Sequence, residues 1–180
     1  MSDHDHDHGL TGSREEEKRE MNLEELSSVV VDSAYHLHVD LGPGLLETVY
    51  ETVLARILSD RGLKVERQKA VIFEYQGIRF EDGLRVDLLI NDRLVVELKS
   101  VETLAPVHAK QLLTYLRLLN QPLGLLINFG AATFKEGIKR VVNQHRDFAS
   151  SRLRVSQEVV SPEGSGGTRS REDREGGGKS

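Results

Sequence analysis

Three charged residues lie in a stretch of sequence that otherwise predicts two buried β-strands joined by a turn. The stretch VDLLINDRLVVELKS, residues 86–100, carries Asp87 near its start and Glu97 and Lys99 near its end. Two facing carboxylates at ~4–5 Å repel each other, so a cation between them would stabilise the pair. Hard oxygen ligands suit Mg²⁺ or Mn²⁺, which lowers the pKa of bound water and accepts phosphate oxygens. A nearby lysine can orient that water or offset charge on a phosphate.

The turn between the two strands decides whether these charges meet. A two-residue turn would put Glu97 on the opposite face from Asp87, whereas a three-residue loop, 91–93, would put them opposite each other. Glu97 and Lys99 share a face because side chains alternate along a strand. The alternative is an ion pair at a strand end without any chemistry, and the hairpin alone leaves both interpretations open. If the three charges share a face, the other face would hold Val86, Leu88, Val96 and Leu98.

Apolar periodicity predicts the elements that would position this hairpin. Leucine, valine and alanine recur every three or four residues over 23–41, which predicts a helix with Asn22 as its N-cap. The sequence GPG at 42–44 ends that helix, and a second helix is predicted over about 45–60 with Pro43 at its start. Residues 69–80 predict a hairpin with its turn at Gln76–Gly77.

The second half of the chain completes the predicted fold. Pro106 begins a helix that is predicted to run through Leu119, and LGLLINF at 123–129 predicts a short buried strand. Residues from Lys135 to about His145 predict a last amphipathic helix. This order of helices and strands predicts an α/β fold with a mixed central β-sheet flanked by helices.

Composition restricts the class of protein. The 180 residues predict one domain over 22–154, between an acidic, histidine-rich tail (1–21) and a glycine- and serine-rich tail (155–180), both expected to be disordered. The absence of cysteine excludes disulfides, thiolate zinc sites and a thiol nucleophile, and fits a reducing cytoplasm. No apolar run approaches the ~20 residues of a membrane helix. Residues 26–150 hold fifteen acidic and fifteen basic residues, which argues against a tight non-specific DNA binder but allows a local basic groove.

The charged hairpin also resembles a known pattern. Asp87, Glu97 and Lys99, as D…E-x-K, resemble the core of the PD-(D/E)XK nuclease superfamily, although Val86 stands where the superfamily name has proline. The segment LGPGLLETVY contains the spacing G-x-x-E-x-x-Y, and GLRVDLLI, VVELKSVETLAPVHAKQLLTYLRL and LGLLINFG follow in order. Over about residues 23–143 the chain therefore resembles the GxxExxY family of that superfamily. The resemblance implies a restriction-endonuclease-like core.

The resemblance also implies roles for individual residues. Asp87 and Glu97 would be ligands of Mg²⁺ or Mn²⁺, and Lys99 would position or activate water. Glu47, on the second helix, would be a further ligand, directly or through water. The alternative for Glu47 is a favourable interaction with the helix dipole, whereas Tyr50 of the same motif is interpreted as a core aromatic.

Two further residues of the resemblance lie on the third helix. Gln111 and Tyr115 match a Q-x-x-x-Y element and share a helix face at i and i+4, so both would point at the hairpin and contact metal-bound water or a phosphate. A core position is the alternative for Tyr115. Arg85 is a candidate for pairing with a carboxylate or binding phosphate. His108 is a candidate for binding phosphate at the edge of the cleft, with a surface histidine as its alternative.

Three functional hypotheses follow. The first is a Mg²⁺- or Mn²⁺-dependent nuclease that cleaves DNA or RNA through a metal-activated water. The second is a catalytically silent, nuclease-like binding or regulatory module, because a fold does not fix a function. The third is a homodimer or a subunit of a larger complex that supplies the nucleic-acid groove.

Overall fold

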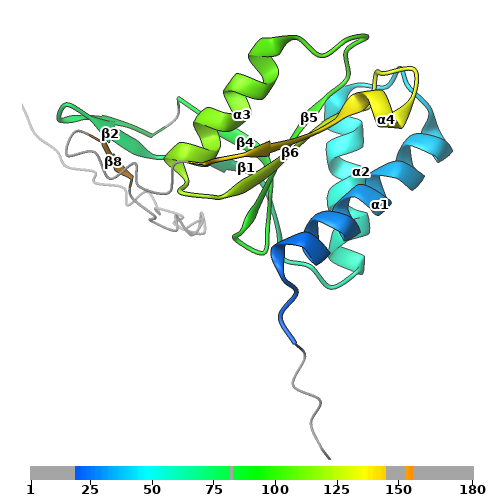
Figure 1. The fold of residues 1–180 in the computed structure, drawn as a ribbon, viewed down its shortest axis with the longest axis horizontal. Helices are drawn as coiled ribbons and strands as arrows, with labels where there is room; N and C mark the ends of the chain where they lie inside the picture. The colour runs from blue at the N-terminus through cyan, green and yellow to red at the C-terminus, as the bar shows by residue number, and fades with distance from the viewer. Residues whose placement is uncertain (1–18, 82, 145–152, 156–180) are drawn as a thin grey trace, which may run out of the picture.

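A five-stranded mixed β-sheet forms the centre of the molecule (Figure 1). The structure is a computed structural model that describes residues 19–81, 83–144 and 153–155. The strands lie in the order β1-β4-β5-β6-β7; β5 and β6 are parallel and the other neighbours are antiparallel. The predicted α/β class with a mixed central sheet is confirmed. The strands are β1 (Val65–Ala70), β4 (Arg85–Ile90), β5 (Leu94–Lys99), β6 (Leu123–Asn128) and β7 (Ile138–Val142).

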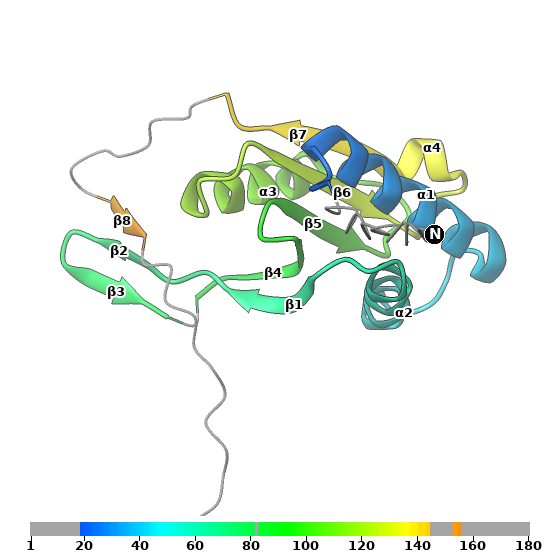
Figure 2. The same cartoon turned by 90° about the horizontal axis from the view of Figure 1, so that it is seen from below.

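Helices cover both faces of this sheet (Figure 2). Helices α1 (Leu23–Leu41) and α2 (Glu47–Asp60) pack on one face, where Leu54 and Leu88 belong to one buried cluster. Helix α3 (Pro106–Leu118) connects the parallel strands β5 and β6 and packs on the other face, where Leu112 and Val95 belong to a second cluster. The sheet is therefore buried on both sides, as its continuous apolar strands require.

The two N-terminal helices are joined by a linker that fixes where α2 begins. Helix α1 has the predicted N-cap, because Asn22 and Glu25 form a capping box, and it ends before Gly42, whose φ is +68°. The hydroxyl of Tyr50 donates to the carbonyl of Gly42 (2.6 Å) and accepts from the N–H of Leu45 (3.2 Å). These bonds hold residues 42–45 outside the helix. Helix α2 consequently starts at Glu47 rather than at the predicted position 45, and Pro43 lies in the linker.

The β4–β5 hairpin has the three-residue loop that was predicted as one alternative. Ile90 pairs with Leu94, so residues 91–93 form the turn, and Asn91 and Asp92 adopt positive φ values of +48° and +56°. Asparagine and aspartate tolerate this left-handed conformation better than most residues. The paired residues end at Leu88 and Val96, so Asp87 and Glu97 are the next residue on each strand, and the carboxylate of Asp87 accepts from the backbone N–H of Leu98.

One residue of this hairpin faces the opposite side from that predicted. Val86 was expected to pack with Leu88, but Val86 belongs to the cluster under α3 and Leu88 to the cluster under α1 and α2. In the antiparallel ladder, Arg67 pairs with Leu88 and Lys69 with Val86, so Gln68 lies opposite Asp87. Gln68 has a φ of +48°, and the regular alternation of side chains along β4 is interrupted at Asp87, the residue opposite it.

A small second sheet extends from the end of β1 (Figure 2). Strands β2 (Phe73–Tyr75), β3 (Ile78–Phe80) and β8 (Leu153–Val155) form it in the order β3-β2-β8. The predicted turn at Gln76–Gly77 is confirmed, and both of its residues have positive φ, as two-residue hairpin turns of this type require. The preceding Lys69 belongs to β1 and not to this hairpin.

The prediction of a last helix over 135–145 is wrong. Instead of one helix over 135–145, a single turn, α4 (Phe134–Gly137), is followed directly by strand β7. The apolar residues Ile138, Val141 and Val142 have helical spacing, but their β-branched side chains also suit a strand. Pairing with the open edge of β6 decides between the two.

The tails predicted for residues 1–21 and 155–180 lie almost entirely outside the described residues. Among the residues that are described, no helix is both long enough and apolar enough to cross a membrane.

Candidate active site

The carboxylate of Glu97 is the most deeply buried charge of the predicted site. Glu97 lies on β5, two residues beyond Val95, and only 2% of it is exposed. The Nζ atom of Lys99 donates to Oε1 of Glu97 at 2.7 Å, whereas Oε2 of Glu97 is buried without a hydrogen-bond partner. Burial, followed by the negative charge of Asp87, raises the pKa of Glu97 to about 7. A proton or a cation is therefore needed to stabilise this carboxylate near neutral pH.

Asp87 contributes the second carboxylate from the neighbouring strand. Its Oδ2 atom accepts from the backbone N–H of Leu98 at 2.7 Å, and its Oδ1 atom accepts from Nε2 of Gln68 at 3.2 Å. Burial raises the pKa of Asp87 above its ordinary value, although these hydrogen bonds and the charge of Lys99 act in the opposite direction. The N–H of Leu98, the residue after Glu97, is thus bonded to the Asp87 side chain.

Lys99 lies between the strand carboxylates and helix α2. Besides its bond to Glu97, its Nζ atom is 4.0 Å from Oε1 of Glu47, in the first turn of α2. Burial lowers the pKa of Lys99, but the hydrogen bond with Glu97 and the surrounding negative charges outweigh burial and raise it. Lys99 is therefore cationic at neutral pH. Burial also raises the pKa of Glu47, although 40% of this side chain is exposed and the charge of Lys99 opposes the shift.

Helix α3 brings two predicted residues to the same site. The side-chain amide of Gln111 donates to the hydroxyl of Tyr115 at 2.7 Å, as their spacing of four residues allows. Tyr115 is only 4% exposed, and burial raises the pKa of its hydroxyl, with a further contribution from the negative charge of Glu97. Tyr115 is thus both a core residue of the α3 face and a neighbour of the carboxylates.

The two residues predicted to bind phosphate have backbone contacts in this structure. Arg85 begins β4, is exposed, and donates from Nη1 to the carbonyl of Gln68 at 3.3 Å. The Nδ1 atom of His108 accepts from the N–H of Ala105 at 3.2 Å, at the start of α3. His108 therefore caps a helix N-terminus, whereas Arg85 lies beside the residue that contacts Asp87.

Sequence reasoning missed a group of residues next to Asp87. Glu51, on α2, is 3% exposed and accepts from Nε of Arg67 (2.8 Å) and from Nε2 of Gln68 (2.7 Å). Glu51 follows Glu47 by four residues, so a search for acids on one helix face would have found it. Arg67 and Gln68 carry no comparable signal, because consecutive strand residues are expected to face opposite sides.

The side chains present fit a divalent cation held by two carboxylates. The unpartnered Oε2 atom of Glu97 and the adjacent carboxylate of Asp87 are hard oxygen donors of the type that Mg²⁺ and Mn²⁺ prefer. Within the described ranges, no group of three or more aspartate, glutamate or histidine side chains is placed to hold a metal ion. Glu47 would therefore complete such a site through water rather than as a third direct ligand.

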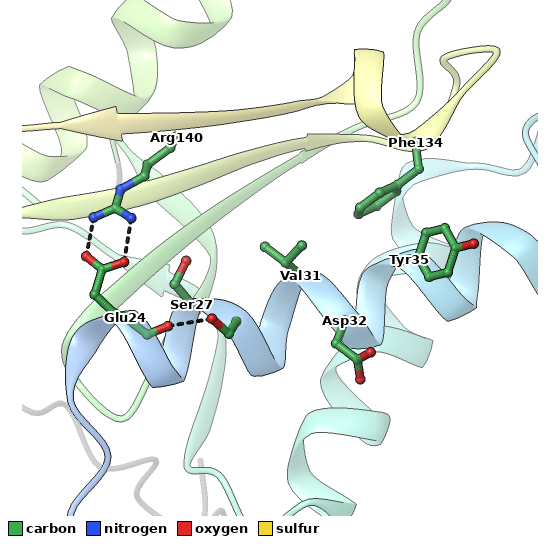
Figure 3. A pocket seen from close by; sticks show the side chains of 8 residues that line it. Glu24, Ser27, Val31, Asp32, Tyr35, Phe134 and Arg140 are labelled. Atoms are coloured by element: carbon green, nitrogen blue, oxygen red, sulfur yellow. Dashed lines mark hydrogen bonds and ion pairs between the residues drawn. The ribbon is translucent and has the colours of Figure 1, made fainter.

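A pocket of about 480 Å³ lies elsewhere, between α1 and the segment of α4 and β7 (Figure 3). Arg140 and Glu24 form two hydrogen bonds across one end of it, and the rings of Tyr35 and Phe134 meet edge to face at the other. None of the predicted site residues lines this pocket. The candidate active site is therefore the carboxylate–lysine cluster and not this cavity.

Comparison with known proteins identifies the superfamily of this chain. A model of the PD-(D/E)XK nuclease superfamily matches residues 24–141, about two-thirds of the chain, and this range includes all the predicted site residues. No curated protein and no solved structure matches the chain significantly. Nucleases of this superfamily generally use divalent metal ions, and the mixed sheet flanked by helices is consistent with their restriction-endonuclease-like fold. The chain therefore belongs to the PD-(D/E)XK nuclease superfamily.

Proposed function

We propose that this chain is a nuclease that hydrolyses phosphodiester bonds of DNA or RNA with Mg²⁺ or Mn²⁺ held by Asp87 and Glu97. The observation that carries the proposal is the buried carboxylate of Glu97, which lies beside a second carboxylate and a lysine and has one oxygen without a partner. A bound cation would supply Lewis acidity and a water of lowered pKa.

The other residues have roles that follow from their positions. Lys99 is cationic and lies within 4.0 Å of two carboxylates, so it would orient the attacking water or offset charge on the phosphate. From their positions on α3, Tyr115 and Gln111 would contact metal-bound water or a phosphate oxygen. Glu47 would bind a water of the cation, and Arg85 would bind phosphate at the edge of the site. His108 would bind phosphate only if its side chain released the N–H of Ala105.

The finer family assignment and the location of the protein also belong to this proposal. The spacing G-x-x-E-x-x-Y at Gly44, Glu47 and Tyr50 supports membership in the GxxExxY family. The absence of cysteine supports a reducing, cytoplasmic environment.

A cleavage assay tests the proposal. Single- and double-stranded DNA and RNA are incubated with the full chain and Mg²⁺ or Mn²⁺, and cleavage is expected for at least one substrate. Asp87→Asn and Glu97→Gln should abolish it, whereas Glu74→Gln on β2 and Lys110→Met, at an exposed position of α3, should leave it unchanged. Cleavage that survives both carboxylate substitutions would overturn the assignment.

A second candidate is a nuclease-like module that binds or regulates without catalysis, alone, as a homodimer or in a larger complex. The 2.7 Å ion pair between Lys99 and Glu97 favours it, because this pair neutralises one carboxylate without a metal. Calorimetric titration with Mn²⁺ separates the candidates, since a silent module needs no cation. Light scattering measures whether the chain associates with itself.

A further inference from the structure

The side-chain amide of Gln68 bridges two carboxylates from different elements. Its Nε2 atom donates to Oε2 of Glu51 on α2 at 2.7 Å and to Oδ1 of Asp87 on β4 at 3.2 Å. An amide nitrogen carries two hydrogens, so one Gln68 side chain can make both bonds at once. Gln68 therefore connects a buried helix residue to a carboxylate of the candidate active site.

The backbone of β1 has an unusual conformation at the residue that makes this bridge. Gln68 has a φ of +48°, a left-handed conformation that is uncommon outside glycine, asparagine and aspartate. Consecutive strand residues normally point to opposite faces, yet Arg67 and Gln68 both reach Glu51. An unfavourable backbone conformation persists where surrounding interactions hold it, and such conformations cluster at functional sites.

Glu51 is a fixed anchor for the bridge. It is 3% exposed, and its two carboxylate oxygens are each occupied, Oε1 by Nε of Arg67 and Oε2 by Gln68. Arg67 is held in turn, because its Nη2 atom donates to Oγ1 of Thr52 at 2.9 Å. The charge of Glu51 is thus paired with Arg67 through Oε1, and Oε2 remains bonded to Gln68.

Asp87 is consequently held at both oxygens. Leu98 donates its N–H to Oδ2 and Gln68 donates to Oδ1, and each oxygen keeps a further acceptor site. We propose that Gln68, anchored by Glu51, is a positioning residue that fixes the orientation in which Asp87 binds a divalent cation. The role of the cation rests on the proposed nuclease function, whereas the orientation of Asp87 does not.

Two substitutions separate this role from a general contribution to folding. Gln68→Asn suits the left-handed backbone but is one methylene too short to span both carboxylates. Gln68→Glu keeps the length and shape but cannot donate to both carboxylates at once, because it donates one hydrogen bond when protonated and none when ionised. Gln76→Asn is the matched control, because Gln76 has nearly the same φ, +52°, in the exposed β2–β3 turn.

Calorimetric titration with Mn²⁺ and thermal unfolding are measured for each full-length variant. Gln68→Asn should remain folded and bind Mn²⁺ ~10-fold more weakly, Gln68→Glu should lose at least as much, and Gln76→Asn should match the wild type. A loss of affinity without a loss of thermal stability is not expected of a residue that only supports the fold. Wild-type affinity in either Gln68 variant would overturn the proposal.

Crystal structures of the metal-free wild type and Gln68→Asn provide the second measurement. Asp87 should occupy one rotamer, bonded to Leu98, in the wild type, and should leave that rotamer or occupy several in the variant. One unchanged rotamer in both would overturn the positioning role. If the wild type binds no Mn²⁺, the proposed nuclease function fails, and these structures still decide whether Gln68 positions Asp87.

Discussion

The Nζ atom of Lys99 lies 2.7 Å from Oε1 of Glu97, while the other oxygen of that buried carboxylate has no partner. A buried ion pair is favourable only when further hydrogen bonds satisfy its remaining polar atoms. The pair is therefore incomplete as a purely structural interaction. A divalent cation at Oε2, shared with Asp87, would complete it.

The stability of the metal-free protein should decrease as the pH rises from about 4.5 to about 7. The pKa of Glu97 is about 7 in the folded state against an ordinary value of 4.5, so the folded state holds more protons in this range and loses stability as they dissociate. The loss from this group is on the order of 3 kcal/mol. The raised pKa values of Asp87 and Glu47 have the same sign.

Urea denaturation with EDTA at a series of pH values measures this dependence. Glu97→Gln should remove most of it, because the amide does not titrate. An equally steep decrease in Glu97→Gln would contradict the assignment of the shift to this residue. Mn²⁺ should also reduce the decrease in the wild type, since a cation stabilises the ionised carboxylates.

Lys99→Met should separate catalysis from metal binding. Cleavage is expected to fall by roughly 10³-fold, because the variant lacks the ammonium group that orients water or offsets charge on the phosphate. Mn²⁺ binding should be retained or strengthened, because Lys99 no longer competes for Oε1 of Glu97. Cleavage rates and calorimetry measure the two effects, with Lys110→Met as the matched control on an exposed face. Loss of both activities together would indicate that Lys99 serves to assemble the site.

Glu47→Gln should weaken Mn²⁺ binding by ~10-fold, the effect expected of a residue that acts on the ion through water. Asp87→Asn should eliminate binding, because it removes a direct ligand. The stability of Glu47→Gln should be close to that of the wild type, since its side chain is 40% exposed and its contact with Lys99 is 4.0 Å long. Glu74→Gln on β2 is the control. Equal losses for Glu47→Gln and Asp87→Asn would assign Glu47 a direct bond to the ion.

Tyr50→Phe should destabilise the protein by about 2 kcal/mol without removing a packed ring. The stack with Phe129, with ring centroids 4.3 Å apart, is preserved, but the carbonyl of Gly42 and the N–H of Leu45 lose their partner. Urea denaturation measures the change, and Tyr35→Phe, at a residue that is 48% exposed, should have no effect. An unchanged stability would show that the 42–46 linker does not depend on the hydroxyl.

The sequence by itself determined the features that depend on neighbouring residues. Helix α1 with its Asn22 cap, the turn at Gln76–Gly77, and the sheet class all follow from apolar period, capping and turn chemistry. The β4–β5 hairpin is a partial case, because the sequence left two loop lengths open; the structure has the three-residue loop, in which Ile90 pairs with Leu94.

Only the tertiary structure decided the features that depend on distant partners. Ile138–Val142 has apolar spacing that suits a helix and becomes a strand because the edge of β6 offers it hydrogen bonds. Val86 packs under α3 and not with Leu88, at the point where β1 has the left-handed residue Gln68. Glu51 meets Gln68 only when α2 packs beside β1. Such contacts join residues far apart in the chain, and their energies depend on burial and pairing that no local pattern encodes.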